Sequence, residues 1–180
     1  MSFWGNFSLN EISLLALNAG AYLLIFLLPG RFTPQVRTLS FLWGLTMGTL
    51  FDFTIGGGLV DFYVVNDTDR YEAFDVMYYL LFAPFGYLFF YFYEVLGINR
   101  RTFILYVAAW SVVGVGAQWG TTLLGIITFQ RGFQVPYTFP VFLITQTVSG
   151  LYLECVKSRQ PVMAPAKKKS AKYVLRRKFT

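Results

Sequence analysis

The chain of 180 residues contains no histidine and a single cysteine, Cys155. Without histidine, imidazole acid–base catalysis and histidine metal ligation are excluded, and one cysteine excludes a disulfide within the chain. The glycines at 56–58 lack the Lys-Ser/Thr continuation of a phosphate-binding loop. These absences predict a protein that is not an enzyme and holds no metal and no cofactor, although carboxylate-only chemistry at Asp52 stays open.

Charged residues are also scarce, at 13% of the chain against 56% hydrophobic residues. An ordinary soluble domain carries about 25% charged residues, so this composition predicts a membrane protein. A span needs about 20 apolar residues, and the stretches that qualify are residues 9–28, 38–60, 74–96, 102–129 and 137–156. We therefore predict an all-α, polytopic transmembrane helix bundle of five spans over residues 1–156, with no separate soluble domain.

The 15 basic residues are distributed unevenly around these stretches. Only Arg70 and Arg131 fall on one side, and the other 13 fall on the opposite side. Because cytoplasmic loops retain Lys and Arg, we expect the N-terminus outside and the C-terminus in the cytoplasm. Residues 157–180 form a basic tail that we expect to be largely disordered and to contact anionic lipid headgroups, not nucleic acid. Its clustered basic residues are Lys167, Lys168, Lys169, Arg176, Arg177 and Lys178.

Asp52 is the most informative polar residue inside a predicted span. Ionisable side chains are costly in hydrocarbon and by default indicate function. Asp52 lies on one helical stripe with Gly44, Gly48 and Gly56, at successive i, i+4 positions. Glycines at this spacing let a neighbouring helix approach closely, so this helix-packing stripe should face the bundle. Burial there favours the protonated form of Asp52, unless a cation or several hydrogen-bond donors hold the carboxylate.

The other spans carry polar features at a similar depth. At 1.5 Å per residue, these features lie roughly 12–17 Å below the outer surface, near the middle of a ~30 Å hydrocarbon core. One of them is a proline, which leaves a carbonyl of its own helix without the usual donor. The sequence thus predicts one intramembrane polar layer, to which every span contributes: Asn18, Asp52, Pro84, Gln118 and Gln146.

This polar layer supports two hypotheses from different functional classes. In the first, the layer is an interhelical hydrogen-bond cluster in which Asp52 donates to an amide. The protein is then a structural or accessory membrane component whose small-residue faces bind a second copy or another membrane protein. In the second, the layer is a polar cavity in a small oligomeric ion or solute transporter or channel, with Asp52 in the pathway. The sequence favours the first, because amides are common in bundle interfaces.

Aromatic side chains fill positions 87–93 with one interruption, Leu88. The cytoplasmic end of this run suits an interfacial aromatic belt, and a ring-lined binding site is the alternative. Glu94 and Glu154 fall near the inner boundary, where we expect them to pair with Lys157 or nearby arginines, or to snorkel to water.

The segment Phe74-Asp75 … Tyr79-Leu80-Leu81-Phe82-Ala83-Pro84, with Asp52 in the preceding span and Trp110 in the next, resembles a family of small, uncharacterised five-helix membrane proteins from spore-forming Gram-positive bacteria. The similarity is spread over roughly residues 40–155. The resemblance implies a location in the bacterial cytoplasmic membrane. It implies no activity, because that family has no established catalytic or binding residue to carry over.

Overall fold

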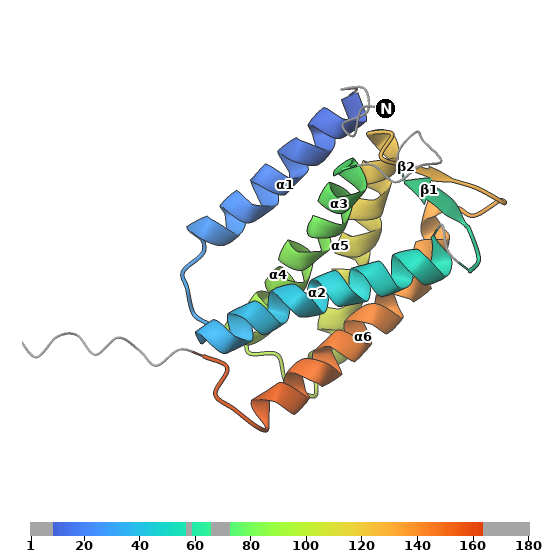
Figure 1. Cartoon of the computed structure of the whole chain (residues 1–180). Helices are drawn as coiled ribbons and strands as arrows, with labels where there is room; N and C mark the ends of the chain where they lie inside the picture. Colours follow the sequence, from blue (N-terminus) through green and yellow to red (C-terminus); the bar gives the residue numbers. More distant parts are fainter. Residues whose placement is uncertain (1–8, 57–58, 66–72, 164–180) are drawn as a thin grey trace, which may run out of the picture.

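The computed structural model describes residues 9–56, 59–65 and 73–163 (Figure 1). It is mostly helical, which confirms the predicted helical class. In chain order the elements are α1 (Leu9–Leu27), α2 (Pro34–Ile55), β1 (Tyr63–Val65), α3 (Ala73–Leu80), α4 (Phe82–Val95), α5 (Phe103–Leu123), β2 (Ile127–Phe129), the 3-10 helix η1 (Val135–Tyr137) and α6 (Thr138–Lys157).

Four stretches are long and apolar enough to cross a membrane: Leu9–Leu27, Phe74–Val95, Phe103–Leu123 and Val135–Lys157. The remaining long helix, α2, has 22 residues but is not among them. It carries Gln35, Arg37 and Asp52 together with several hydroxyl residues, which lower its mean hydropathy. Within the described residues, four spans meet this criterion and not the five that the sequence predicts.

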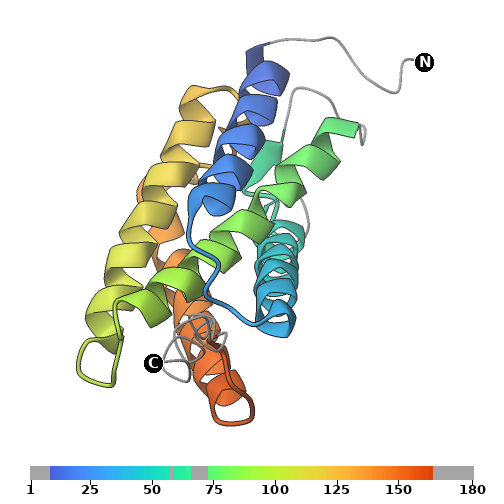
Figure 2. The same cartoon turned by 90° about the vertical axis from the view of Figure 1, so that its left-hand side faces the viewer.

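Successive long helices run in alternating directions, so their connections gather at two opposite ends of the bundle (Figures 1 and 2). The α1–α2 connection, the α4–α5 turn and the end of α6 lie at one end, which we call the basic end. The strands β1 and β2 and the start of α6 lie at the other, which we call the capped end. α4 runs through the middle of the bundle, behind α2 in Figure 1.

The aromatic run of α4 is core and not an interfacial belt. Phe89 and Phe90 are fully buried, and Tyr87, Tyr91 and Tyr93 are nearly so. A helix that is hydrophobic on every side is buried on every side, and here each face of α4 meets aromatic rings of a different helix. The ring pairs are Phe41 of α2 with Tyr87, Tyr106 of α5 with Phe89, and Tyr152 of α6 with Phe90.

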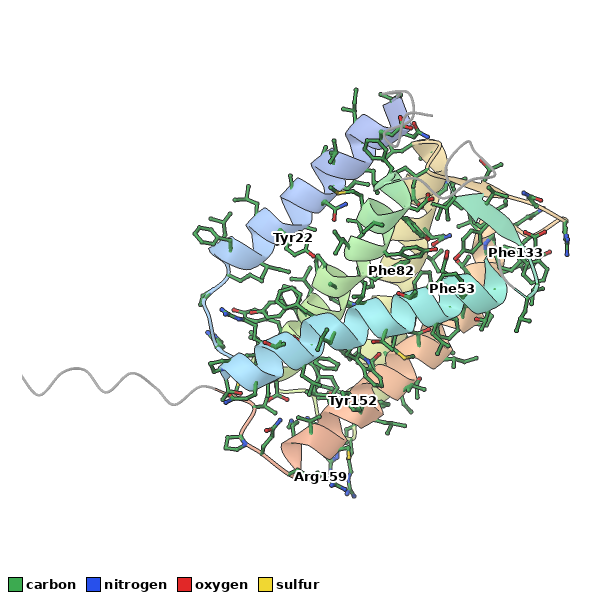
Figure 3. All side chains as sticks on the ribbon, in the orientation of Figure 1. Tyr22, Phe53, Phe82, Phe133, Tyr152 and Arg159 are labelled. Atoms are coloured by element: carbon green, nitrogen blue, oxygen red, sulfur yellow. The ribbon has the colours of Figure 1, made fainter. Side chains whose placement is uncertain are left out.

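The predicted third span, residues 74–96, is broken at Leu81 into α3 and α4. The Leu81 amide bonds the carbonyl of Tyr78 in a tight turn, at 3.1 Å, and Pro84 follows in the first turn of α4. Pro84 has no N–H, so the Leu80 carbonyl lacks its helical donor. The hydroxyl of Tyr22 on α1 donates to that carbonyl at 3.1 Å, and Figure 3 shows Tyr22 on the side of α1 that faces α3 and α4.

The second and fourth helices end earlier than the predicted bounds of 38–60 and 102–129. α2 begins at Pro34, where Thr33 accepts a hydrogen bond from the Val36 amide, and it ends at Ile55. α5 ends at Leu123 because Gly125 adopts a positive φ of 71°, which favours glycine and terminates a helix. Residues 127–129 then pair antiparallel with 63–65 in a two-stranded sheet.

The first residues of the predicted basic tail pack back onto the bundle. Lys157 is the last residue of α6, and Val162 beyond it is 5% exposed. The Thr33 amide donates to the Val162 carbonyl at 3.0 Å, and Phe32 and Met163 form an isolated bridge. Residues 158–163 therefore close the basic end against the α1–α2 connection.

Candidate functional site

Asp52 lies near the capped end of α2 and is 5% exposed. The hydroxyl of Tyr63 on β1 donates to its Oδ1 at 2.8 Å, and the hydroxyl of Tyr79 on α3 donates to its Oδ2 at 2.8 Å. Both carboxyl oxygens are thus engaged by tyrosines from two different elements. The sequence predicts an amide as the partner of Asp52, and the structure places these tyrosines there instead.

Tyr63 connects this carboxyl group to the small sheet. It is 8% exposed, and its ring meets the ring of Phe129 edge-on at 6.3 Å across the strand pair. Burial raises the pKa of the Tyr63 hydroxyl far above its ordinary value, and the neighbouring Tyr78 and Asp52 add to that shift. The hydroxyl therefore stays protonated at any physiological pH and remains a hydrogen-bond donor.

The glycine stripe of α2 faces α3, α4 and β1. A Cβ on Gly44 would lie 2.8 Å from the Cα of Gly86, so the backbones of α2 and α4 meet at this pair. Gly48 lies against the ring of Phe82, which Figure 3 places in the middle of the bundle. Gly56 lies against the ring of Tyr63. The stripe thus brings Asp52 close enough for Tyr63 and Tyr79 to reach it.

Gln118 of α5 and Gln146 of α6 meet at a cavity of about 100 Å³ beside α2. Gly44, Gly48 and Tyr63 line the same cavity, so it begins where the Asp52 cluster ends. Gln146 is 4% exposed, and its amide makes no hydrogen bond to any residue in the part of the chain that the structure describes. None of the described lining residues carries a charge.

The remaining members of the predicted polar layer lie elsewhere. Asn18 is buried between α1 and α3, where its Nδ2 donates to the carbonyls of Leu14 at 2.9 Å and Met77 at 3.0 Å. Pro84 lines a second cavity, of about 310 Å³, between α1, α4 and α5. Gln118 lines both cavities, so the predicted layer separates into an α1–α3 link, an Asp52 cluster and a glutamine cavity.

At the basic end, Lys157 pairs with both predicted glutamates. Its Nζ lies 2.7 Å from Oε1 of Glu94 and 3.2 Å from Oε1 of Glu154. The tail residues predicted to contact lipid headgroups, from Lys167 to Lys178, lie outside the described residues. Within the described ranges there is no group of three or more Cys, Asp or Glu side chains that could hold a metal ion.

Comparison with protein-family models, curated proteins and solved structures finds no match. The resemblance to a five-helix family therefore stays a prediction, and any function must be argued from the residues of this chain. The sequence did not predict two residues of this site, Tyr63 and Tyr79. Tyr63 falls outside every predicted span, and Tyr79 is one of two adjacent tyrosines. Only the pairing of β1 and the break after α3 identify them.

Proposed function

We propose that this chain is a multi-pass integral membrane protein that acts as a structural or accessory component of the membrane. Its surface supports this proposal, because large apolar side chains are exposed along all the long helices that surround α4, namely α1, α2, α5 and α6. Examples are Phe26 at 84% exposed on α1 and Ile104 at 76% on α5. Polar residues such as Ser40 and Ser111 are fully buried instead. This reverses the usual arrangement of a water-soluble protein.

We further propose five spans, with α2 as the second, the N-terminus outside and the C-terminus in the cytoplasm of a bacterium. At 1.5 Å per residue, the 22 residues of α2 extend about 33 Å, enough to cross a ~30 Å core. Ser40 and Asp52 of α2 are buried, whereas the exposed Gln35 and Arg37 lie in its first turn, at the basic end. The connections at the basic end contain Arg31, Arg100, Arg101 and Arg159, whereas Arg131 follows β2 at the capped end. This distribution supports the proposed orientation, because cytoplasmic loops retain basic residues.

The single observation that carries the structural role is the engagement of Asp52. A carboxyl group that serves an ion or solute must be reachable, yet both oxygens of Asp52 already accept hydrogen bonds from tyrosines. These bonds join α2 to α3 and to β1. Asp52 therefore stabilises the packing of α2, α3 and β1 at the capped end. We propose no catalytic or transport chemistry for it.

The alternative is a small oligomeric ion or solute transporter or channel with Asp52 in the pathway. One observation favours it: the uncharged cavity lined by Gln118 and Gln146 also reaches Tyr63, the partner of Asp52. Displacement of Tyr63 would join that cavity to the carboxyl group. This alternative needs the capped end to open, whereas the structural role needs it to stay closed.

The substitution D52N separates the two functions. Asparagine keeps one carbonyl oxygen for one tyrosine hydroxyl, and the other hydroxyl can accept from the new NH2 group. We expect a folded protein destabilised by about 1–2 kcal/mol, the difference between a hydrogen bond to a charged group and one to a neutral group. The measurement is thermal unfolding of the purified protein, followed by tryptophan fluorescence.

The same variant and the wild type are then reconstituted into liposomes for flux of protons, monovalent cations and small solutes. The structural role predicts equal, background flux for both. A wild-type flux that D52N abolishes, with its fold intact, would overturn the proposal in favour of the transporter. D61N is the matched control, because the Asp61 carboxylate is exposed and pairs with Arg131 at the surface, where such pairs contribute about 0–1 kcal/mol.

A further inference from the structure

The larger cavity opens on the apolar surface between two helices that lie far apart in the sequence. It has a volume of about 310 Å³, and its lining includes Leu17 of α1 and Ala117 of α5. Both residues are exposed at the surface, and both lie well inside their helices, away from the ends. In the proposed membrane placement, the mouth of this cavity faces hydrocarbon and not headgroups.

The walls of the larger cavity are almost entirely apolar. They include Leu81, Pro84 and Leu88, and the described lining residues carry no charge. A dry cavity of about 150 Å³ lined by such side chains accommodates benzene, which has six carbon atoms. A cavity twice that size therefore accommodates an alkyl chain of about twelve carbons.

The two cavities adjoin. The side chains that line both are Tyr78, Phe82, Phe85, Gln118 and Phe142. Beyond this shared boundary, the smaller cavity of about 100 Å³ ends at Gln146, which is more than nine-tenths buried and faces it without a hydrogen-bond partner among the described residues. A hydrogen bond to such an amide contributes about 0.5–1.5 kcal/mol, so a polar ligand group at this position is favoured.

We propose that these cavities together bind one single-chain amphiphile with an uncharged, hydrogen-bonding head. The chain lies in the larger cavity and enters from the membrane between α1 and α5. The head lies in the smaller cavity, where Gln118 and Gln146 bond it. A charged head is rejected, because neither cavity offers a counter-charge and an unpaired buried charge is far more costly than a buried hydroxyl. This inference rests on the proposed membrane placement.

The probe is 1-lauroylglycerol, which has a twelve-carbon acyl chain and a neutral diol head. The full chain in phosphatidylcholine nanodiscs is incubated with the radiolabelled probe, and empty nanodiscs give the background. We expect saturable binding of one probe per chain. Unlabelled lauroylglycerol should displace it at concentrations at least tenfold lower than laurate, which adds a charge, or dodecane, which lacks a head.

Two substitutions test the two halves of the site separately. Q146L removes the amide at nearly constant volume and should lower the affinity for lauroylglycerol at least tenfold, leaving it no better a ligand than dodecane. A117F places a ring at the surface mouth and should also lower the affinity at least tenfold. Q160L is the matched control, because Gln160 is exposed and lies outside both cavities, and it should bind like the wild type.

Several outcomes would overturn the inference. Equal competition by dodecane would show an apolar cavity without head recognition, and wild-type affinity in A117F would place the probe outside the cavity. If the protein fractionates with membranes but its binding of the radiolabelled probe does not saturate, this inference alone is refuted. If the protein does not fractionate with membranes, the proposed function is refuted as well. Where Q146L fails to fold, as judged by its melting, Q118L on the shared wall and the surface variant A117F decide the matter.

Discussion

Substitution of alanine for Gly44 tests the helix crossing on which the Asp52 cluster depends. A Cβ on Gly44 would lie 2.8 Å from the Cα and 2.9 Å from the amide nitrogen of Gly86. Carbon atoms in favourable contact are about 3.5–4.0 Å apart, so α2 and α4 would have to separate by about 1 Å. The obstacle is backbone on both sides, and no side-chain rotation can relieve it.

Overpacking of this kind costs about 1–3 kcal/mol. Alanine returns about 0.5–1 kcal/mol through its better helix propensity. Because backbone atoms cannot rotate away, the upper part of the overpacking range applies, about 2–3 kcal/mol. The net loss for G44A is therefore about 1–2.5 kcal/mol, which corresponds to a fall in Tm of about 2–10 °C for a chain of this length. The assay is thermal unfolding of the purified protein in one detergent, followed by circular dichroism.

Gly20 of α1 provides the matched control, because a Cβ there would meet nothing within 4 Å. G20A should raise Tm, through propensity alone. The reasoning is refuted if G44A melts at or above the wild-type temperature, or if both variants shift in the same direction. G86A should resemble G44A, and the double variant G44A/G86A should lose less than the sum of the two, because the first alanine already separates the helices.

Two further predictions concern hydrogen bonds and charges at other positions. Y22F removes the donor to the Leu80 carbonyl and should lower the free energy of unfolding by about 1 kcal/mol. Y137F, at an exposed residue, is the control and should leave Tm unchanged. Equal shifts in Tm for the two variants would contradict a stabilising Tyr22–Leu80 hydrogen bond. K157M leaves Glu94, whose side chain is 11% exposed, without its cation and should lower the free energy of unfolding by about 1–3 kcal/mol. The double variant E94Q/K157M should recover most of that loss. A double variant less stable than K157M would refute the pairing.

The positions of the long helices were predictable from the sequence because each lies within an apolar run, whereas the ends of α2 and α5 and the break at Leu81 were not. The glycine stripe and the Leu80 carbonyl that lacks a helical donor could also be located, since spacing and the missing proline N–H are local properties. The partners of those features could not be located. Gly86 and Tyr22 lie far along the chain from the groups they contact, and only the packing of α4 on α2 and α1 brings them there.

The capped end was the least predictable part of the fold. Residues 127–129 read as a continuation of the fourth span because they are apolar, and residues 63–65 read as loop because they are few. Three-residue strands are stable only through pairing with each other and packing beneath, and such tertiary pairing leaves no periodic signal in the sequence. Gly125 is the one local signal of the helix end, since its positive φ is a conformation that glycine adopts readily.

Whether Tyr63 can move away from Asp52 distinguishes a structural membrane component from a transporter. Tyr63 covers Oδ1 of Asp52 with a 2.8 Å hydrogen bond and belongs to a strand paired residue for residue with β2. Displacement also disturbs Asp61 and Arg131, which join the same two connections through a 2.8 Å ion pair. Opening therefore disturbs the strand pairing and the ion pair and breaks the Tyr63–Asp52 hydrogen bond, whereas lateral entry of an amphiphile between α1 and α5 breaks none of them. A ligand that reaches this protein from the membrane is thus compatible with a closed cap, and a solute that reaches it from water is not.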